Sequence, residues 1–252
     1  MTCLIIAARE LRSLFLSPLA WVVLGVTQFL LAYTFLSRIE YFIQVQPRLA
    51  AIDGAPGVTD LVAAPLLGSA AFVLLMIVPL LSMRLLAEER RNGSLTLLLS
   101  APLRLSDIVL GKYLGLLAFM WLMVLMIALM PLSLLLGTHI DLGQLAAGVL
   151  GLGLLLAAFS AIGLFVSSLS AQPSVAAIGC FGVLMFLWII DWAGASMGQT
   201  QSGVLNALSL MSHYQHLLQG VFSSADVAYY LIVTTTFLAL TLWRLDLERQ
   251  PG

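Results

Sequence analysis

Six long hydrophobic runs divide this chain, and each is long enough to cross a lipid bilayer as a helix, which takes about 20 apolar residues. The runs occupy residues 18–36, 62–83, 108–136, 142–169, 175–190 and 227–243. The third and fourth exceed the required length and are expected to tilt, whereas the fifth is short. The pattern predicts an all-α membrane protein with six transmembrane helices, in a single domain over residues 1–252.

The residues before the first run form an amphipathic pattern of their own. On a helical wheel Arg9, Arg12 and Ser13 share one side, and the opposite side is apolar: Leu4, Ala7, Ala8, Leu11, Leu14 and Phe15. Ile5, Ile6 and Leu16 fall on or beside the polar side. The pattern predicts an interfacial helix that lies along the membrane, ends at Ser17-Pro18, and includes Arg9, Glu10, Leu11 and Arg12. A frayed N-terminus is the alternative. A secretory signal peptide fits less well because the following run is too long.

The composition supports the membrane assignment. Hydrophobic residues make up 61% of the chain and charged residues only 9%, against roughly 25% charged in a soluble domain. A soluble core of 252 residues cannot hide that much apolar surface. The two cysteines, Cys3 and Cys180, indicate neither a disulfide framework nor a zinc site. The formal net charge of −1 gives no reason to expect nucleic acid as a partner.

Lysine and arginine are distributed unevenly between alternate loops, and this asymmetry sets the expected orientation. With the N-terminus inside the cell, only Arg38 and Arg48 of the eleven basic residues lie outside. The nine on the inside are Arg9, Arg12, Arg84, Arg90, Arg91, Arg104, Lys112, Arg244 and Arg249. We therefore expect a multi-pass protein of the bacterial inner membrane with both termini in the cytoplasm.

The hydrophobic runs carry no ionisable group in their interiors, since Arg84, Lys112 and Asp191 lie at their edges. Ion-driven carriers hold their ions with such groups at mid-membrane, and membrane-embedded hydrolases need a base, a nucleophile or metal ligands there. The chain also lacks a phosphate-binding loop, because Gly111-Lys112 is followed by Tyr113. We therefore expect no enzymatic activity, cofactor or metal on this chain. If the chain moves a substrate, another subunit must therefore supply the energy.

The segment between the second and third runs, residues 84–112, is the most informative. The second helix is expected to continue through Glu88, Glu89, Arg90 and Arg91 and to stop at Asn92-Gly93, where glycine suits a left-handed C-cap. Ser94 is then expected to N-cap a short helix, ended by Pro102, whose apolar residues are Leu95, Leu97, Leu98 and Leu99. Ser106 and Asp107 are expected to cap the third span. A helix this short cannot stand alone, so it packs on the chain's own helices or into the lipid headgroups, or it docks on a cytoplasmic partner.

The run from Glu88 to Pro102, EERRNGSLTLLLSAP, resembles the signature between the second and third helices of ABC-2 type permeases. These are the membrane subunits of one class of ATP-binding-cassette transporters. The run is most similar to the gliding-motility-associated branch, and more loosely to the nitrous-oxide-reductase maturation permeases. Three further segments resemble that branch: Arg9 to Pro18, Ile108 to Lys112, and Ser212 to Tyr230. Thr96 stands where the branch commonly has a glutamate, which removes an acidic contact.

The resemblance implies six helices per subunit, an N-terminal elbow helix, a coupling helix in the loop after the second helix, and a re-entrant outer segment before the sixth. It implies that the coupling segment contacts a separate ABC ATPase. It also implies a second permease copy, identical or related. We expect an exporter driven by that ATPase. The alternative is a membrane anchor that transmits ATPase motion to periplasmic or surface proteins without transporting a substrate.

Three weaker patterns are more simply explained by structure than by function. His213 and His216 stand three apart and could share a metal on a helix, but no third ligand is evident, so a polar face of the outer segment is favoured. Asp226 is expected to cap the sixth helix. The pairs Gly111/Gly115 and Gly163/Ser167 fit a small-xxx-small packing pattern, which arises easily in a chain with 20 glycines.

Overall fold

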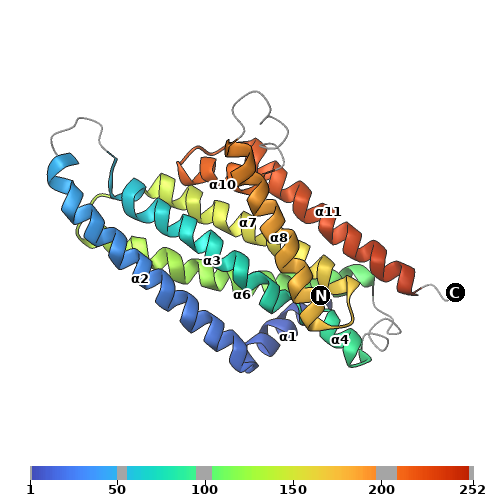
Figure 1. Cartoon of the computed structure of the whole chain (residues 1–252). Helices are drawn as coiled ribbons and strands as arrows, with labels where there is room; N and C mark the ends of the chain where they lie inside the picture. The colour runs from blue at the N-terminus through green and yellow to red at the C-terminus, as the bar shows by residue number, and fades with distance from the viewer. Residues whose placement is uncertain (1, 50–55, 95–103, 197–208, 250–252) are drawn as a thin grey trace.

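The structure, a computed structural model, describes residues 2–49, 56–94, 104–196 and 209–249, and every element in these ranges is a helix (Figure 1). Six stretches are long and apolar enough to cross a membrane: Pro18–Arg48, Thr59–Arg91, Leu105–Leu136, Leu142–Leu169, Pro173–Ile190 and Ser224–Arg249. The all-α architecture with six candidate transmembrane helices is therefore confirmed.

Helix α1 (Thr2–Leu16) meets α2 (Pro18–Leu49) at an elbow. The turn predicted at Ser17-Pro18 is confirmed, and proline suits the first position of a helix because its missing N–H would have no partner there anyway. Helix α2 continues well past the predicted end at residue 36. Its 32 residues are about 48 Å long, against a hydrocarbon core of about 30 Å. The extension is supported by Ile39 and Phe42, which pack against the core.

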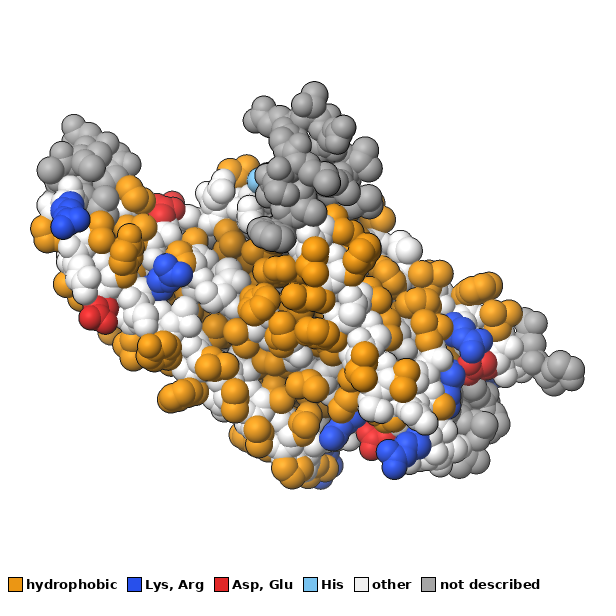
Figure 2. All heavy atoms as spheres, in the orientation of Figure 1, with side chains coloured by type: hydrophobic (Ala, Val, Ile, Leu, Met, Phe, Trp, Pro, Cys, Tyr) orange, Lys and Arg blue, Asp and Glu red, His pale blue; other side chains and the backbone are white. Residues whose placement is uncertain are grey.

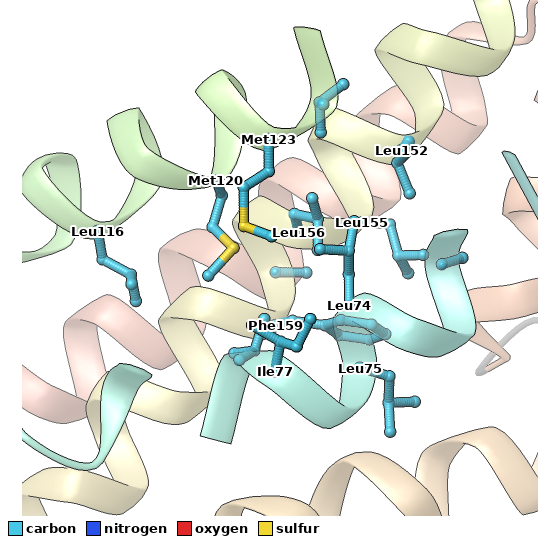
Figure 3. Packing of buried hydrophobic residues seen from close by; sticks show 14 of the residues in the cluster. Leu74, Leu75, Ile77, Leu116, Met120, Met123, Leu152, Leu155, Leu156 and Phe159 are labelled. Atoms are coloured by element: carbon cyan, nitrogen blue, oxygen red, sulfur yellow. The ribbon is translucent and has the colours of Figure 1, made fainter. Parts of the chain in front are cut away.

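Helix α7 (Leu142–Leu169) is the central helix of the bundle. It packs against α3 (Ala64–Ser82), α6 (Leu105–Ser133), α8 (Pro173–Ser196), α10 (Leu210–Leu218) and α11 (Ser224–Arg249). Between α3, α6 and α7 lies a tightly packed core (Figure 3), whose members Leu74, Met120, Met123, Leu156 and Phe159 are at most 1% exposed. Because lipid tails are as apolar as these side chains, close van der Waals packing holds the helices together.

The start of α6 differs from the sequence prediction. The helix begins at Leu105 with Arg104 as its N-cap and without a side-chain capping hydrogen bond, so the cap predicted at Ser106 and Asp107 is wrong. Asp107 lies in the first turn, where a carboxylate suits the positive end of the helix dipole. Its Oδ2 accepts a hydrogen bond from Thr2 Oγ1 at 3.2 Å, which joins the start of α1 to the start of α6.

Helix α10 precedes the last span and packs against α7 and α8. Its buried Tyr214 donates a hydrogen bond to the backbone oxygen of Leu67 at 3.1 Å. Asp226 is not the cap of α11, because it lies inside the first turn and its Oδ1 is 2.6 Å from Nδ1 of His213, while its Oδ2 is 3.5 Å from His216 Nδ1. Within the described ranges, no group of three or more His, Cys, Asp or Glu is arranged to hold a metal ion. The re-entrant placement of the outer segment stays a prediction.

Charged side chains gather towards the two ends of the molecule on the face shown in Figure 2, and the surface between them is hydrophobic. Large apolar side chains are exposed on the spanning helices; Phe29 is 74% exposed, Ile178 73% and Phe186 65%. Exposed residues of this size would be costly in water over so wide a surface. Lipid tails are the solvent that this surface fits.

Candidate coupling site around α4

The chain between α3 and α4 (Ala87–Arg91) does not form one continuous helix. Helix α3 ends at Ser82, and residues 83–86 form a turn before α4 starts. The prediction of an unbroken second helix through Arg91 is therefore wrong. The same end of the bundle carries α1 and the C-terminal end of α11 (Figure 1).

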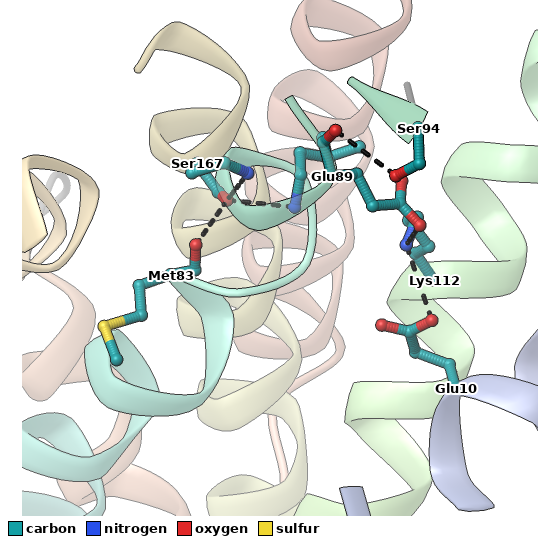
Figure 4. Close-up of polar contacts among 8 residues, drawn as sticks. Glu10, Met83, Glu89, Ser94, Lys112 and Ser167 are labelled. Carbon is teal, nitrogen blue, oxygen red and sulfur yellow. Dashed lines mark hydrogen bonds and ion pairs between the residues drawn. The ribbon is translucent and has the colours of Figure 1, made fainter. Parts of the chain in front are cut away.

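The break is held by Ser167, a fully buried residue of α7. Its hydroxyl oxygen accepts hydrogen bonds from the backbone N–H groups of Leu86 at 3.2 Å and Ala87 at 3.1 Å. The same hydroxyl donates to the backbone oxygen of Met83 at 3.2 Å (Figure 4). One side chain thus satisfies three backbone groups that the interrupted helix would leave unpaired, and buried backbone groups need such partners.

One helical turn before Ser167, Gly163 allows α7 to approach the end of α3. A Cβ atom at Gly163 would lie 2.5 Å from Ser82 Oγ and 2.7 Å from Ser82 Cβ, which is too close for any real side chain. The pair Gly163/Ser167 therefore forms the surface on which the break rests. Its sequence pattern alone carried little weight, and the packing gives it a specific role.

A buried ion cluster joins α4 to α1 and α6. The side chain of Lys112 is only 3% exposed, and its Nζ lies 2.8 Å from Glu89 Oε1 and 3.4 Å from Glu10 Oε2 (Figure 4). A buried ammonium group must be paired, because an uncompensated charge at such a site is strongly unfavourable. The three residues come from three segments that the resemblance singled out separately, and the fold brings them together.

Burial raises the pKa of Glu10 above its usual range, and the neighbouring Lys112 opposes that effect. The charge of Glu89 raises the pKa further, because the two carboxylates repel each other. Glu89 Oε2 is buried and has no hydrogen-bond partner within the described part of the chain. The cluster thus holds one cation between two carboxylates, one oxygen of which is unsatisfied.

Close packing of α1 on α6 positions Glu10 beside Lys112. A Cβ at Gly111 would lie 2.7 Å from Ile6 Cβ, and one at Gly115 would lie 2.7 Å from Glu10 Cβ. The face of α1 predicted to be apolar is therefore partly wrong. Ile6, assigned to the polar side, packs on α6, whereas Leu4 is 68% exposed. A helical wheel does not predict that the polar Glu10 faces inward, because its ion-pair partner, Lys112, lies on another helix.

The other members of the interfacial helix are placed less closely. Arg9 and Arg12 are exposed, and Leu11 is half-buried against the core. The helix predicted over these residues is present. Its position in the membrane interface stays a prediction.

A second ion pair joins α4 to α11. Arg90 Nη2 lies 2.7 Å from Glu248 Oε1 and 2.8 Å from Glu248 Oε2. Arg244, one turn before Glu248, also contacts Oε1, at 3.1 Å. These side chains are 20–35% exposed, so the pair adds little stability, about 0–1 kcal/mol for surface pairs. Its contribution is geometric, because it fixes the orientation of α4 against the C-terminal helix.

Helix α4 ends as the sequence predicts. Gly93 has φ of +71°, the left-handed conformation of a C-cap glycine. Ser94 Oγ donates to the backbone oxygen of Glu89 at 3.3 Å, while Glu88 and Arg91 are exposed. The remaining predicted coupling residues, Leu95, Leu97, Leu98, Leu99 and Pro102, lie outside the described residues.

Three residues of this candidate site were not among the site residues predicted from the sequence. Lys112 was placed at the edge of a span, yet a lone lysine in an otherwise apolar run is itself a signal of a buried ion pair. Glu248 carries no signal that the sequence could reveal, because its partner on α4, Arg90, is 158 positions away. The Gly163/Ser167 pattern indicated close packing and not the hydrogen bonds of Ser167 with residues 83–87.

The fold and the site define a multi-pass membrane protein in which a short helix at one end is tied to four membrane-associated helices. The sequence profile of the family described as "ABC-2 family transporter protein" matches residues 4–248, nearly the whole chain. The chain belongs to this family, and it is a transmembrane permease of an ABC transporter. A comparison with curated proteins found no match.

Proposed function

We propose that this protein is the permease subunit of an exporter, driven by a separate ABC ATPase that binds ATP and Mg²⁺. The observation that carries the proposal is the anchoring of α4. Lys112 joins α4 to α1 and α6, Ser167 joins it to α7, and Glu248 joins it to α11. A force applied to the segment directly after α4 therefore reaches four helices.

The break at residues 83–86 supports this mechanism. A short helix separated from α3 can move as a rigid unit when it is pushed, and packed helices respond to such pushes by shifting between discrete arrangements.

The partners we propose are the ATPase at residues 88–102, a second permease copy, and the lipid of a bacterial inner membrane. The chain itself takes no catalytic part and carries no cofactor. A periplasmic partner remains part of the anchor alternative. Flux of a substrate in reconstituted vesicles separates the exporter from that anchor.

Replacing Leu98 with aspartate should weaken ATPase docking at least tenfold. Burying one leucine contributes about 1.5–3 kcal/mol, and a poorly solvated charge adds to the loss. Gly93→Val should act differently, because a β-branched residue resists the φ of +71°. The leucines remain but are misdirected, so the complex should form with reduced ATP hydrolysis. The measurement is co-purification with the ATPase encoded beside the permease, together with ATP hydrolysis.

Gly57→Val is the matched control for Gly93→Val, because a Cβ at Gly57 meets nothing within 4 Å and its φ is not positive. Gly57→Val should leave both the co-purification with the ATPase and the ATP hydrolysis unchanged. Full complex and full activity in both Leu98→Asp and Gly93→Val would show that this loop is not the coupling element.

Single cysteines at Asp53, Thr138 and Gln199 should react with an impermeant thiol reagent added outside the cell, and cysteines at Ser94 and Gln250 should not. The nine-to-two distribution of basic residues places the second group in the cytoplasm. Cells permeabilised before labelling provide the control, in which all five positions react. Labelling of Ser94→Cys in intact cells would contradict the proposed orientation.

A further inference from the structure

A cavity of about 310 Å³ lies where α1, the end of α3, α4 and α6 meet. Its walls carry three basic and three acidic side chains: Arg9, Arg84, Lys112, Glu10, Glu88 and Glu89. The buried leucines Leu81 and Leu85 also line it. Such a cavity suits a ligand that carries one positive and one negative charge and is attached to an apolar group.

Several of these charged groups are open to a ligand. Glu88 lines the cavity, is exposed, and forms no ion pair with any described residue. Neither Arg9 nor Arg84 forms an ion pair with any described residue, and Arg84 Nη1 donates only a neutral hydrogen bond, at 3.2 Å, to Ser17 Oγ. The cavity therefore offers one carboxylate and two guanidinium groups that have no ion-pair partner among the described residues.

The surface beside the cavity is apolar, and the interfacial position expected for α1 would bring this surface against lipid. Ile5 and Leu16 on α1 are 67% and 76% exposed, and Trp21 at the start of α2 is 60% exposed. Tryptophan and arginine gather at the boundary between lipid tails and water. A cavity with charged walls and apolar surroundings at this boundary lies at the depth of phospholipid headgroups.

We propose that this cavity binds the headgroup of a zwitterionic phospholipid with a primary amine, of the phosphatidylethanolamine type. Its phosphate faces Arg9 and Arg84, because arginine binds phosphate oxygens through paired N–H groups. Its ammonium group donates to the exposed carboxylate of Glu88. An anionic lipid would bring no cation to the three carboxylates, and a choline headgroup has no N–H to donate.

The test is native mass spectrometry of the full-length permease, purified and exposed to an equimolar mixture of dioleoyl phosphatidylethanolamine, phosphatidylcholine and phosphatidylglycerol. A charge-assisted hydrogen bond contributes enough for roughly tenfold preference for phosphatidylethanolamine over phosphatidylcholine. Stepwise N-methylation of the amine should reduce retention at each step. Arg9→Gln and Glu88→Gln should each reduce it several-fold, and both side chains are exposed, so folding is not at risk.

Arg12→Gln is the matched control, because Arg12 lies on the same exposed helix but does not line the cavity. It should retain the wild-type preference. Equal retention of phosphatidylethanolamine and phosphatidylcholine, a preference for phosphatidylglycerol, or equal behaviour of Arg9→Gln and Arg12→Gln would overturn the proposal. Loss of the lipid when the ATPase is co-purified would instead assign the cavity to that protein. The comparison of lipids is made on the permease purified without ATPase, so a failure of the proposed ATPase coupling would leave the measured lipid preference unchanged.

Discussion

Lys112→Met should destabilise the protein by about 3 kcal/mol, because removing one partner of a buried ion pair leaves the others uncompensated. Here two carboxylates, Glu10 and Glu89, would face each other without a cation. The estimate stands at the low end of the usual range because these side chains are 21% and 30% exposed and keep some hydration. Thermal unfolding in detergent should show a melting temperature lowered by about 5–10 °C.

Replacing both glutamates as well, as Glu10→Gln and Glu89→Gln in the Lys112→Met background, should restore most of the loss, since no charge is then left uncompensated. Arg38→Met, at an exposed arginine of α2, is the control and should change stability by less than about 0.5 kcal/mol. A wild-type melting temperature for Lys112→Met would show that the cluster contributes nothing to the fold.

The same variant should recover as the pH falls. The pKa of Glu10 is already raised by burial, and loss of Lys112 removes the charge that opposes that rise. The folded state then binds the proton more tightly than the unfolded state, so stability is lost as the pH rises through the folded pKa. The difference in the free energy of unfolding between Lys112→Met and the wild type should therefore narrow as the pH falls from about 8 to about 5.

Ser167→Ala should cost about 2–4 kcal/mol, because two buried N–H groups and one carbonyl lose their partner at once, at about 1–3 kcal/mol for each unsatisfied group, partly recovered by relaxation. The loss should be local to the break between α3 and α4. Hydrogen exchange followed by mass spectrometry should show faster exchange at Leu86 and Ala87, whose N–H groups bond to this hydroxyl. Coupling to the ATPase should also fall, because α4 loses its hydrogen bond to α7.

Ser168→Ala provides a closely matched control for that change. Ser168 is the next residue, is equally buried, and donates only to the backbone oxygen of Phe165 within its own helix. Its removal should leave exchange at Leu86 and Ala87 at the wild-type rate. If the two alanine variants behave alike, Ser167 does not hold the break.

The transmembrane helices were predictable because each one corresponds to an uninterrupted run of apolar residues in the sequence. Six apolar runs of sufficient length required six helices, and local chemistry placed some of the ends, as at Ser17-Pro18 and Gly93. Predictions failed where a helix end depends on another helix. The break after Ser82 is an example, because the groups that replace its helical hydrogen bonds belong to α7.

The candidate site was predictable in its location and not in its connections. Residues 88–94 were identified from a contiguous sequence pattern, which can be recognised without knowing the fold. The partner of Glu89 is 23 positions away and that of Arg90 is 158 positions away, and no periodicity links such positions. The glycines Gly111 and Gly115 gave an ambiguous signal for the same reason, since their value depends on the helix that packs against them.

The sequence by itself determined that this chain spans a membrane, and it located the segment expected to meet the ATPase. The first follows from local physics, because transfer of a helix into lipid depends on its own side chains and its own backbone hydrogen bonds. The second follows from the resemblance of the contiguous run Glu88 to Pro102 to the ABC-2 type permeases. Only the tertiary structure decided that Lys112 is buried between two glutamates, that Ser167 bridges an interrupted helix, and that a charged cavity opens beside α1. These depend on which helix faces close together, and in lipid that choice rests on shape and on pairing of polar groups between distant residues.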